Sequence, residues 1–98
     1  MAGNHIDLSA GSLFKRGVTS ATVLTVSNAA PAGFVSRFTL QLTNGGSQSL
    51  TWFGGICWPG GMAPALTVAG VDRLGFESDD GGVTWHAQVL SLNSKAVL

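Results

Sequence analysis

The chain has 98 residues, of which 45% are hydrophobic and only 10% are charged, and its five basic and five acidic residues give a formal net charge of zero. This length predicts a single domain, residues 1–98, with one hydrophobic core. The composition argues against nucleic-acid and membrane partners, because only Lys15 and Arg16 are adjacent cations and no apolar run reaches the ~18 residues of a membrane span.

The first third of the chain contains weak strand signals. Residues 5–8 and 13–15 are candidates for short strands separated by a bend at Ala10 and Gly11. Residues 22–27, "TVLTVS", are rich in β-branched side chains, which favour strands. The following segment, residues 27–34, contains Pro and Gly and is predicted to be a loop.

Residues 36–43, "SRFTLQLT", alternate between apolar and polar side chains, which is typical of a strand with one buried face. The next five residues, "NGGSQ", begin with Asn and two Gly, which tolerate the backbone conformations of tight turns. Residues 49–53 resume the alternation with Leu50 and Trp52 on one face. The pattern predicts an antiparallel hairpin between residues 36–43 and 49–53.

The segment 52–64, "WFGGICWPGGMAP", combines large apolar side chains with four glycines and two prolines, so it cannot form a regular helix. Its apolar side chains gain about 1.5–3 kcal/mol each if fully buried, so the segment is not expected to extend into solvent. Two alternatives stay open: it caps the open end of its own domain, or it packs on a neighbouring subunit. The candidate interface residues are Trp52, Phe53, Ile56, Trp58, Pro59 and Met62.

The last third predicts a second hairpin. Residues 71–78 place Leu74 and Phe76 on one face, "DDGG" forms a turn, and residues 83–89 alternate again. Residues 66–68 are a candidate for a further short strand. About seven or eight short strands joined by Gly, Asn and Asp turns predict an all-β fold, either an antiparallel β-sandwich or a jelly-roll-like barrel.

Few side chains could carry chemistry. The two histidines, His5 and His86, have no evident set of partners, and we expect no catalytic residues, no metal and no cofactor. Asp79 and Asp80 could hold a weak Ca²⁺, although Asp is also a common turn residue. Cys57 is the sole cysteine, so it forms no internal disulfide, and a small buried thiol is the expected role.

Four segments occur in a fixed order: "DLSAGSLF", "TLQLTNGGSQSLTW", "WPGGMAPALT" and "GVDRLGFESDDGGVTW". Together they resemble a small β module common in tailed-bacteriophage virion proteins, from about Asp7 to Trp85. The resemblance implies a structural component of the virion that forms trimers or other symmetric assemblies. The chain departs from the usual pattern at Arg73, where an aliphatic residue is common, and at His86, where Tyr is common, and both side chains are expected to face outward.

The low charge content also favours permanent packing against other chains, because the centres of obligate interfaces are apolar. With the resemblance, this predicts a capsid decoration (cement) protein, a homotrimer that contacts other virion proteins such as the major capsid protein. Such a protein is assembled in the cytoplasm of the bacterial host and resides in the virion. The alternative is a tail or fibre-associated subunit that binds a host receptor or glycan. Residues 1–4 and 92–98 are candidate arms that reach neighbouring subunits.

Overall fold

The computed structural model describes residues 3–95, which form nine short β-strands and one 3₁₀ helix. The all-β class predicted from the sequence is confirmed. No α-helix occurs in this part of the chain, and none of its residues forms a helix able to cross a membrane. The elements are β1 His5–Asp7, β2 Leu13–Gly17, β3 Thr22–Val23, β4 Thr25–Ser27, β5 Ser36–Thr43, β6 Leu50–Thr51, β7 Ile56–Cys57, the 3₁₀ helix η1 Pro59–Gly61, β8 Val71–Ser78 and β9 Trp85–Ser91.

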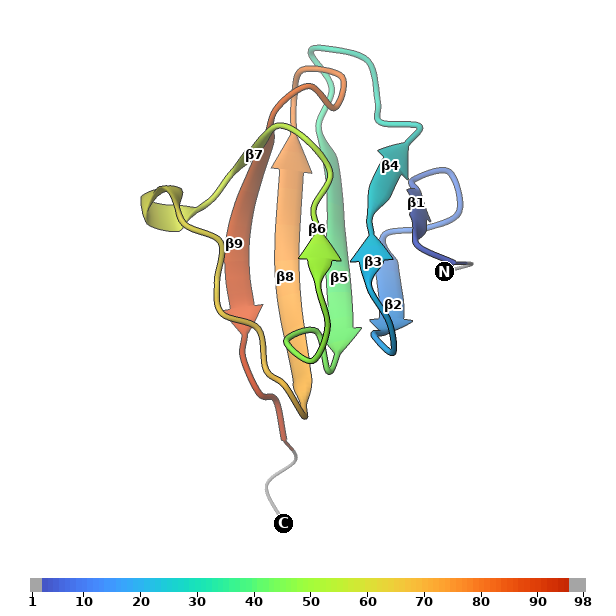
Figure 1. Ribbon diagram of the computed structural model, residues 1–98. Helices are drawn as coiled ribbons and strands as arrows, with labels where there is room; N and C mark the ends of the chain where they lie inside the picture. Colours follow the sequence, from blue (N-terminus) through green and yellow to red (C-terminus); the bar gives the residue numbers. More distant parts are fainter. Residues whose placement is uncertain (1–2, 96–98) are drawn as a thin grey trace.

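Five of the strands form one sheet in the order β2-β5-β8-β9-β7 (Figure 1). Its centre is antiparallel, because β8 pairs in that sense with β5 on one side and with β9 on the other. Its two edges are parallel, since β2 runs parallel to β5 and β7 runs parallel to β9. The sheet is therefore mixed, although mainly antiparallel. The predicted hairpin in the last third of the chain is confirmed, with its second strand beginning at Trp85 instead of Val83.

The predicted hairpin between residues 36–43 and 49–53 is wrong. Both edges of β5 are occupied, one by β2 and the other by β8, so β6 finds no free edge there and pairs in parallel with β3 instead. The turn itself forms where it was expected: Asn44 has a positive φ of 57°, and its carbonyl accepts a hydrogen bond from the amide of Ser47 at 3.0 Å. The turn thus directs the chain out of the large sheet.

The same turn explains why the candidate strand at residues 66–68 does not form. Gly46 lies so close to this segment that a Cβ atom on it would be 2.2 Å from the carbonyl oxygen of Leu66. Its amide donates to the carbonyl of Thr67 at 3.0 Å. Residues 66–68 therefore pack across the turn instead of along another strand.

Two parallel pairs, β1 with β4 and β3 with β6, lie across one face of the sheet (Figure 1). The predicted strand at residues 22–27 is split between these pairs at Leu24, whose side chain points into the core with 1% exposure. The amide of Leu24 donates to the carbonyl of Thr51 at 2.9 Å, so the backbone stays bonded through the break. The chain thereby passes from one pair to the other without leaving the layer.

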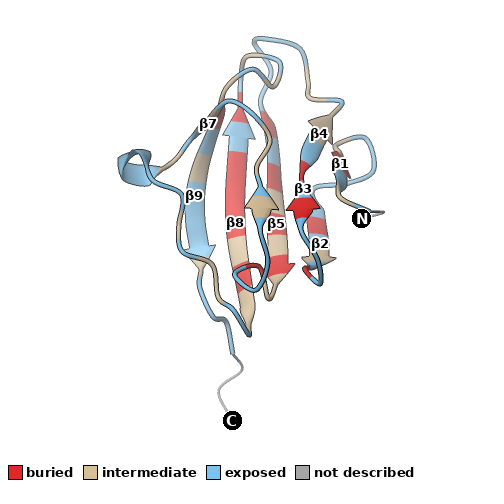
Figure 2. Ribbon diagram, viewed as in Figure 1, coloured by how far each residue is buried: buried red, intermediate tan, exposed pale blue. Residues whose placement is uncertain are grey.

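The core lies between the sheet and the two short pairs, and Figure 2 shows buried residues concentrated along β5 and β8. Its centre is Phe38, whose ring centroid lies 5.0 Å from that of Phe76 and 5.3 Å from that of Trp85. The alternation predicted for residues 36–43 and 71–78 is confirmed. The buried hydrophobic residues are Ile6, Phe14, Val18, Leu24, Phe38, Leu40, Leu42, Leu74, Phe76 and Trp85.

The predicted arms fall partly outside the described residues, which exclude 1–2 and 96–98. Within the described part, the carbonyl of Asn4 accepts a hydrogen bond from the amide of Thr25 at 3.3 Å. At the other end, the amide of Ser94 donates to the carbonyl of Val71 at 2.7 Å. These portions of both arms are therefore bonded to their own domain.

The buried carboxylate of Asp72 joins β8 to the segments that precede β8 and follow β9. Asp72 is fully buried, and its oxygens accept hydrogen bonds from the amide and hydroxyl of Thr67 at 2.7 and 2.6 Å and from the amide of Asn93 at 2.9 Å. Burial alone raises the pKa of Asp72, but the hydrogen bonds from Thr67 and Asn93 outweigh it and hold the pKa below the usual carboxyl range. The charged form thus fixes both the segment before β8, at Thr67, and the segment after β9, at Asn93, to β8.

We predict that Asp72→Asn lowers the free energy of unfolding at neutral pH by about 1.5–3 kcal/mol, because it weakens charge-assisted hydrogen bonds. Since the pKa of Asp72 is lowered on folding, this stabilisation is present above the ordinary carboxyl pKa and is lost as the pH falls through the folded-state value. Urea denaturation at neutral and acidic pH measures the difference, with the exposed Asp79→Asn as control. An equal deficit at both pH values would contradict this role.

Candidate functional site

The crossover, residues 52–64, connects β6 to the segment that leads into β8, and it projects beside β9 (Figure 1). Midway along it, β7 joins the edge of the large sheet, where Ile56 pairs with Trp85 and Cys57 with His86. The 3₁₀ helix η1 follows and forms the tip of the projection. The crossover is therefore anchored at its middle and extended at its tip.

The aromatic half of the crossover packs on its own domain. Trp52, Phe53, Ile56 and Trp58 are half-buried and lie against the core. The ring centroids of Trp52 and Trp58 are 4.9 Å apart, and that of Trp58 is 5.8 Å from Phe76. Edge-to-face contacts of this kind contribute about 0.5–1.5 kcal/mol beyond the burial of area. Four of the six predicted interface residues thus also cap the core of the chain itself.

The tip of the crossover, residues 59–62, is exposed. Pro59 and Met62, the other two predicted interface residues, face solvent, and the side chain of Met62 is 78% exposed. No residue of η1 is buried. Gly60 and Gly61 have positive φ values of 65° and 75°, which permit the tight turn that brings Met62 outward. The tip therefore presents an adaptable apolar side chain on a bent loop.

The path of the crossover is fixed by the close approach of Gly55 to the turn before β9. The carbonyl of Gly55 accepts a hydrogen bond from the amide of Trp85 at 2.8 Å. Gly55 has a positive φ of 80°, and a Cβ atom on it would lie 2.0 Å from the carbonyl oxygen of Val83. Only glycine fits this position, whereas the neighbouring Gly54 has open space around it.

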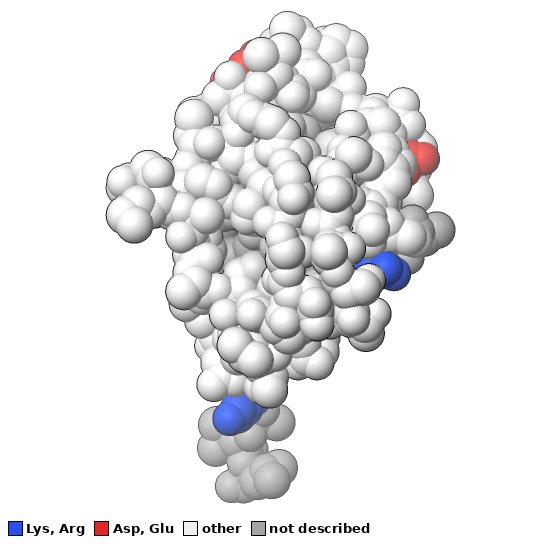
Figure 3. All heavy atoms as spheres, in the orientation of Figure 1, with Lys and Arg blue, Asp and Glu red and all other residues white. Residues whose placement is uncertain are grey.

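The face formed by the short strands and the crossover carries almost no charge. Figure 3 views this face and shows charged side chains only near its margins. Val23 of β3 and Met62 of the tip are exposed apolar residues here. A further group of exposed apolar residues lies where the loop before β5 meets the β8–β9 turn, and it consists of Phe34, Val35 and Val83. The two loops are joined there by a hydrogen bond of 3.0 Å from the amide of Gly33 to the carbonyl of Asp79.

The opposite face of the large sheet is polar. The Nε atom of Arg37 on β5 forms an ion pair with Oε2 of Glu77 on β8 at 2.8 Å. On the same face, Nε of Arg73 donates to Oε1 of Gln41 at 2.8 Å. His86 is exposed there as well, so the prediction that Arg73 and His86 face outward is confirmed. Arg37, Glu77 and Arg73 thus lie on the face that the short strands leave uncovered.

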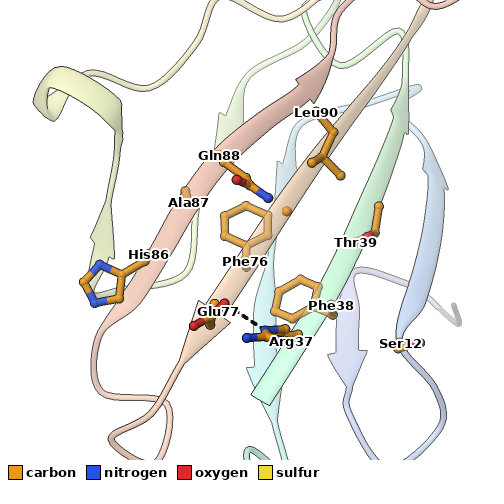
Figure 4. Close-up of a pocket in the computed structure, with 11 residues that line it drawn as sticks. Ser12, Arg37, Phe38, Thr39, Phe76, Glu77, His86, Ala87, Gln88 and Leu90 are labelled. Atoms are coloured by element: carbon orange, nitrogen blue, oxygen red, sulfur yellow. Dashed lines mark hydrogen bonds and ion pairs between the residues drawn. The ribbon is translucent and has the colours of Figure 1, made fainter. Parts of the chain in front are cut away.

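A hollow of about 660 Å³ lies on this polar face (Figure 4). Its lining comes from β5, β8 and β9, including Gly75 in the middle of β8, and from Ser12 just before β2. The sequence analysis did not identify it, although an isolated Gly inside a strand is a recognised sign of close approach by another group. The lining residues are Ser12, Arg37, Phe38, Thr39, Gly75, Phe76, Glu77, His86, Ala87, Gln88 and Leu90.

The titratable groups noted in the sequence have structural partners. His5 bridges two hydroxyl groups of β4, with its Nδ1 atom 2.6 Å from Oγ1 of Thr25 and its Nε2 atom 2.7 Å from Oγ of Ser27. Asp7 accepts hydrogen bonds from Asn28 and Ser9. These bonds lower the pKa of Asp7, and the bond from Asn28 has the largest effect. Both side chains thus fasten β1 to β4 and the loop after it.

Asp79 and Asp80 behave as turn residues. Oδ1 of Asp80 accepts hydrogen bonds from the amide of Thr84 and the hydroxyl of Ser78, both at 2.9 Å. The amide of Thr84 is the main cause of the lowered pKa of Asp80. Within residues 3–95, no three His, Cys, Asp or Glu side chains are close enough to share a metal ion.

Cys57 is exposed, so the expected buried role is wrong. It lies in the two-residue strand β7, where successive side chains point to opposite faces. Ile56 takes the inward position and packs on the core, which leaves the outward position to Cys57. An edge strand so short buries only one of its two side chains.

We predict that Trp58→Ala lowers the free energy of unfolding by about 2–3 kcal/mol, less than the ~3–5 kcal/mol of a fully buried aromatic residue. The loss follows from the contacts of Trp58 with Trp52 and Phe76. Met62→Ala serves as the control and is expected to change stability by less than about 0.5 kcal/mol, because Met62 is exposed. Thermal and urea denaturation measure both variants. Equal effects would show that the tip packs as tightly as the aromatic half.

We predict that Gly55→Ala destabilises the fold by about 3 kcal/mol, since it combines a positive φ with a clash against the backbone of Val83. Gly54→Ala is the matched control, and its stability should stay close to that of the wild type. Urea denaturation compares the two variants. A Gly55→Ala protein as stable as Gly54→Ala would mean that the crossover can take another path.

Comparison of the chain with protein-family models, with curated proteins and with solved structures finds no match. A function for it is therefore argued from its own residues. These offer an anchored crossover with an exposed tip, an almost uncharged face, and a polar face with a hollow.

Proposed function

We propose that this chain is a structural assembly subunit, a capsid decoration (cement) protein of a tailed bacteriophage that stabilises the head through apolar contacts between subunits. In this proposal it forms a homotrimer, contacts other virion proteins such as the major capsid protein, and performs no catalysis. The two layers of strands around one core support the finer assignment of the fold as a β-sandwich. The resemblance of its sequence segments to the phage module supports the virion context.

The observation that carries the proposal is the division of the crossover. Its aromatic half is held against the core, so the tip is presented in a fixed place with Met62 78% exposed. A loop that served only to cap its own domain would gain nothing from an exposed Met at its tip. Met is adaptable in shape and is enriched in interfaces, which suits contact with a protein neighbour.

The charge distribution supports the same face as the contact surface. The short-strand face is almost uncharged, whereas Arg37, Arg73 and Glu77 lie on the opposite face. Removing an uncharged surface from water avoids the desolvation penalty of ionised groups. We therefore assign the short-strand face and the tip to the assembly contacts and leave the polar face to solvent.

We predict that the purified protein is an oligomer by size exclusion with light scattering and that Met62→Asp shifts it toward the monomer without lowering its melting temperature. The aspartate would bury an unpaired charge in the interface but is exposed in the monomer. Leu13→Asp is the control, since Leu13 is exposed on β2 in the large sheet, away from the tip. A wild type that stays monomeric at high concentration and fails to bind capsids would overturn the proposal.

A further inference from the structure

The hollow on the polar face lies on the side of the sheet opposite the proposed assembly surface. It is therefore available to a ligand whether or not the chain assembles, and the inference below does not rest on the proposed function. The volume of about 660 Å³ falls within the ~300–1,000 Å³ typical of small-ligand sites. All of its lining residues except Ser12 come from three adjacent strands of one sheet, which hold them in fixed register.

The floor of the hollow depends on Gly75. Gly weakens the interior of a strand, so its presence at the middle of the central strand β8 needs a local reason. A Cβ atom there would lie 3.3 Å from Cγ and Nε2 of Gln88 and 3.6 Å from Cδ1 of Leu90. The missing side chain thus lets Gln88 and Leu90 of β9 lie across β8 and cover Gly75, which is buried. The side chain of Leu90, which is 48% exposed, gives the hollow an apolar floor.

One wall of the hollow is the ion pair between Arg37 and Glu77. Its 2.8 Å contact uses Nε of the guanidinium and Oε2 of the carboxylate. Among the described residues, the Nη atoms of Arg37 and Oε1 of Glu77 have no hydrogen-bond partner, and both side chains are substantially exposed. The pair therefore offers hydrogen-bond donors and an acceptor side by side, with no net charge.

The other polar side chains around the hollow can both donate and accept hydrogen bonds. Figure 4 shows Gln88 and His86 on β9 and Thr39 on β5, on either side of β8. The amide of Gln88 and the hydroxyl of Thr39 can each donate and accept hydrogen bonds. The hollow thus combines many donors and acceptors with a small apolar floor.

We propose that this hollow binds one residue of a neutral saccharide. Adjacent hydroxyl groups of a sugar donate and accept in pairs, which matches the free edges of the Arg37–Glu77 pair, and the C–H face of the ring fits over the exposed side chain of Leu90. A charged ligand is disfavoured because Glu77 already neutralises Arg37. An apolar ligand would leave these polar groups without partners.

The affinity for a single sugar is expected to be weak, in the millimolar range, because the hollow is open and no exposed aromatic ring stacks on the ligand. If the chain coats a particle, as the proposed function has it, many copies would raise the apparent affinity through multivalency. The monomer suffices to test binding itself.

The test is an NMR titration of the ¹⁵N-labelled protein with the methyl glycosides of glucose, galactose, mannose and N-acetylglucosamine. For at least one sugar, the amide signals of Gly75, Glu77 and Gln88 should shift in a saturable manner. Glu77→Gln, which removes the carboxylate, and Gly75→Val, which pushes aside the side chains of Gln88 and Leu90, should each weaken binding about tenfold or more. Arg73→Gln, on the same face but outside the hollow, should change it less than twofold.

Fold integrity is checked in the same spectra, and Glu77→Gln keeps the experiment decisive if Gly75→Val fails to fold, because Glu77 is exposed. Three outcomes overturn the proposal. The first is the absence of shifts with all four sugars at the highest soluble concentration. The second is a set of shifts confined to the crossover, and the third is tighter binding of glucuronate or inorganic phosphate, which would make this an anion site.

Discussion

The packing of Phe38 against Phe76 holds the structure together. These rings come from adjacent strands β5 and β8 and stack with centroids 5.0 Å apart. Phe14 of β2, Trp85 of β9 and Phe53 of the crossover contact this pair of rings. A single aromatic cluster therefore joins four strands of the sheet, β2, β5, β8 and β9, to the crossover. The crossover keeps its course because its tryptophans complete this cluster. The two surfaces assigned a role in our proposals are placed relative to this cluster: the tip lies beyond its tryptophans, and the polar face lies on the other side of the sheet.

Strand pairs could be predicted from the sequence only where the two strands are close together along the chain. The alternation in residues 36–43 and 71–78 gave both strands to the residue, and the "DDGG" turn gave the β8–β9 hairpin, because these signals are local. The first hairpin failed for a non-local reason. Nothing near residues 36–43 signals that β2, more than twenty residues away, and β8 take both edges of β5. Two strands that pair in parallel are not joined by a tight turn, so no local sequence pattern identifies them as partners.

The candidate sites show the same limit. The apolar crossover was visible in the sequence, but its division into a packed half and an exposed tip depends on Gly55 meeting the carbonyl of Val83, a contact between distant segments. The prediction that Cys57 is buried was wrong because the direction of its side chain depends on the register of β7 against β9. The hollow was missed because its residues are dispersed over β5, β8 and β9, and only Gly75 marks it. The oligomer, the virion setting and the saccharide remain proposals for experiment.

The order of the strands along the chain has a consequence for biosynthesis. β8 supplies a partner to both β5 and β9, yet it follows seven other strands in the sequence. A nascent chain that has emerged only as far as the crossover has one edge of β5 open and lacks Phe76 and Trp85 of the aromatic cluster. Stable structure must therefore wait until residues 71–91 have left the ribosome, and the long loops then close together. During that interval, the apolar segments depend on rapid completion or on chaperones to avoid aggregation.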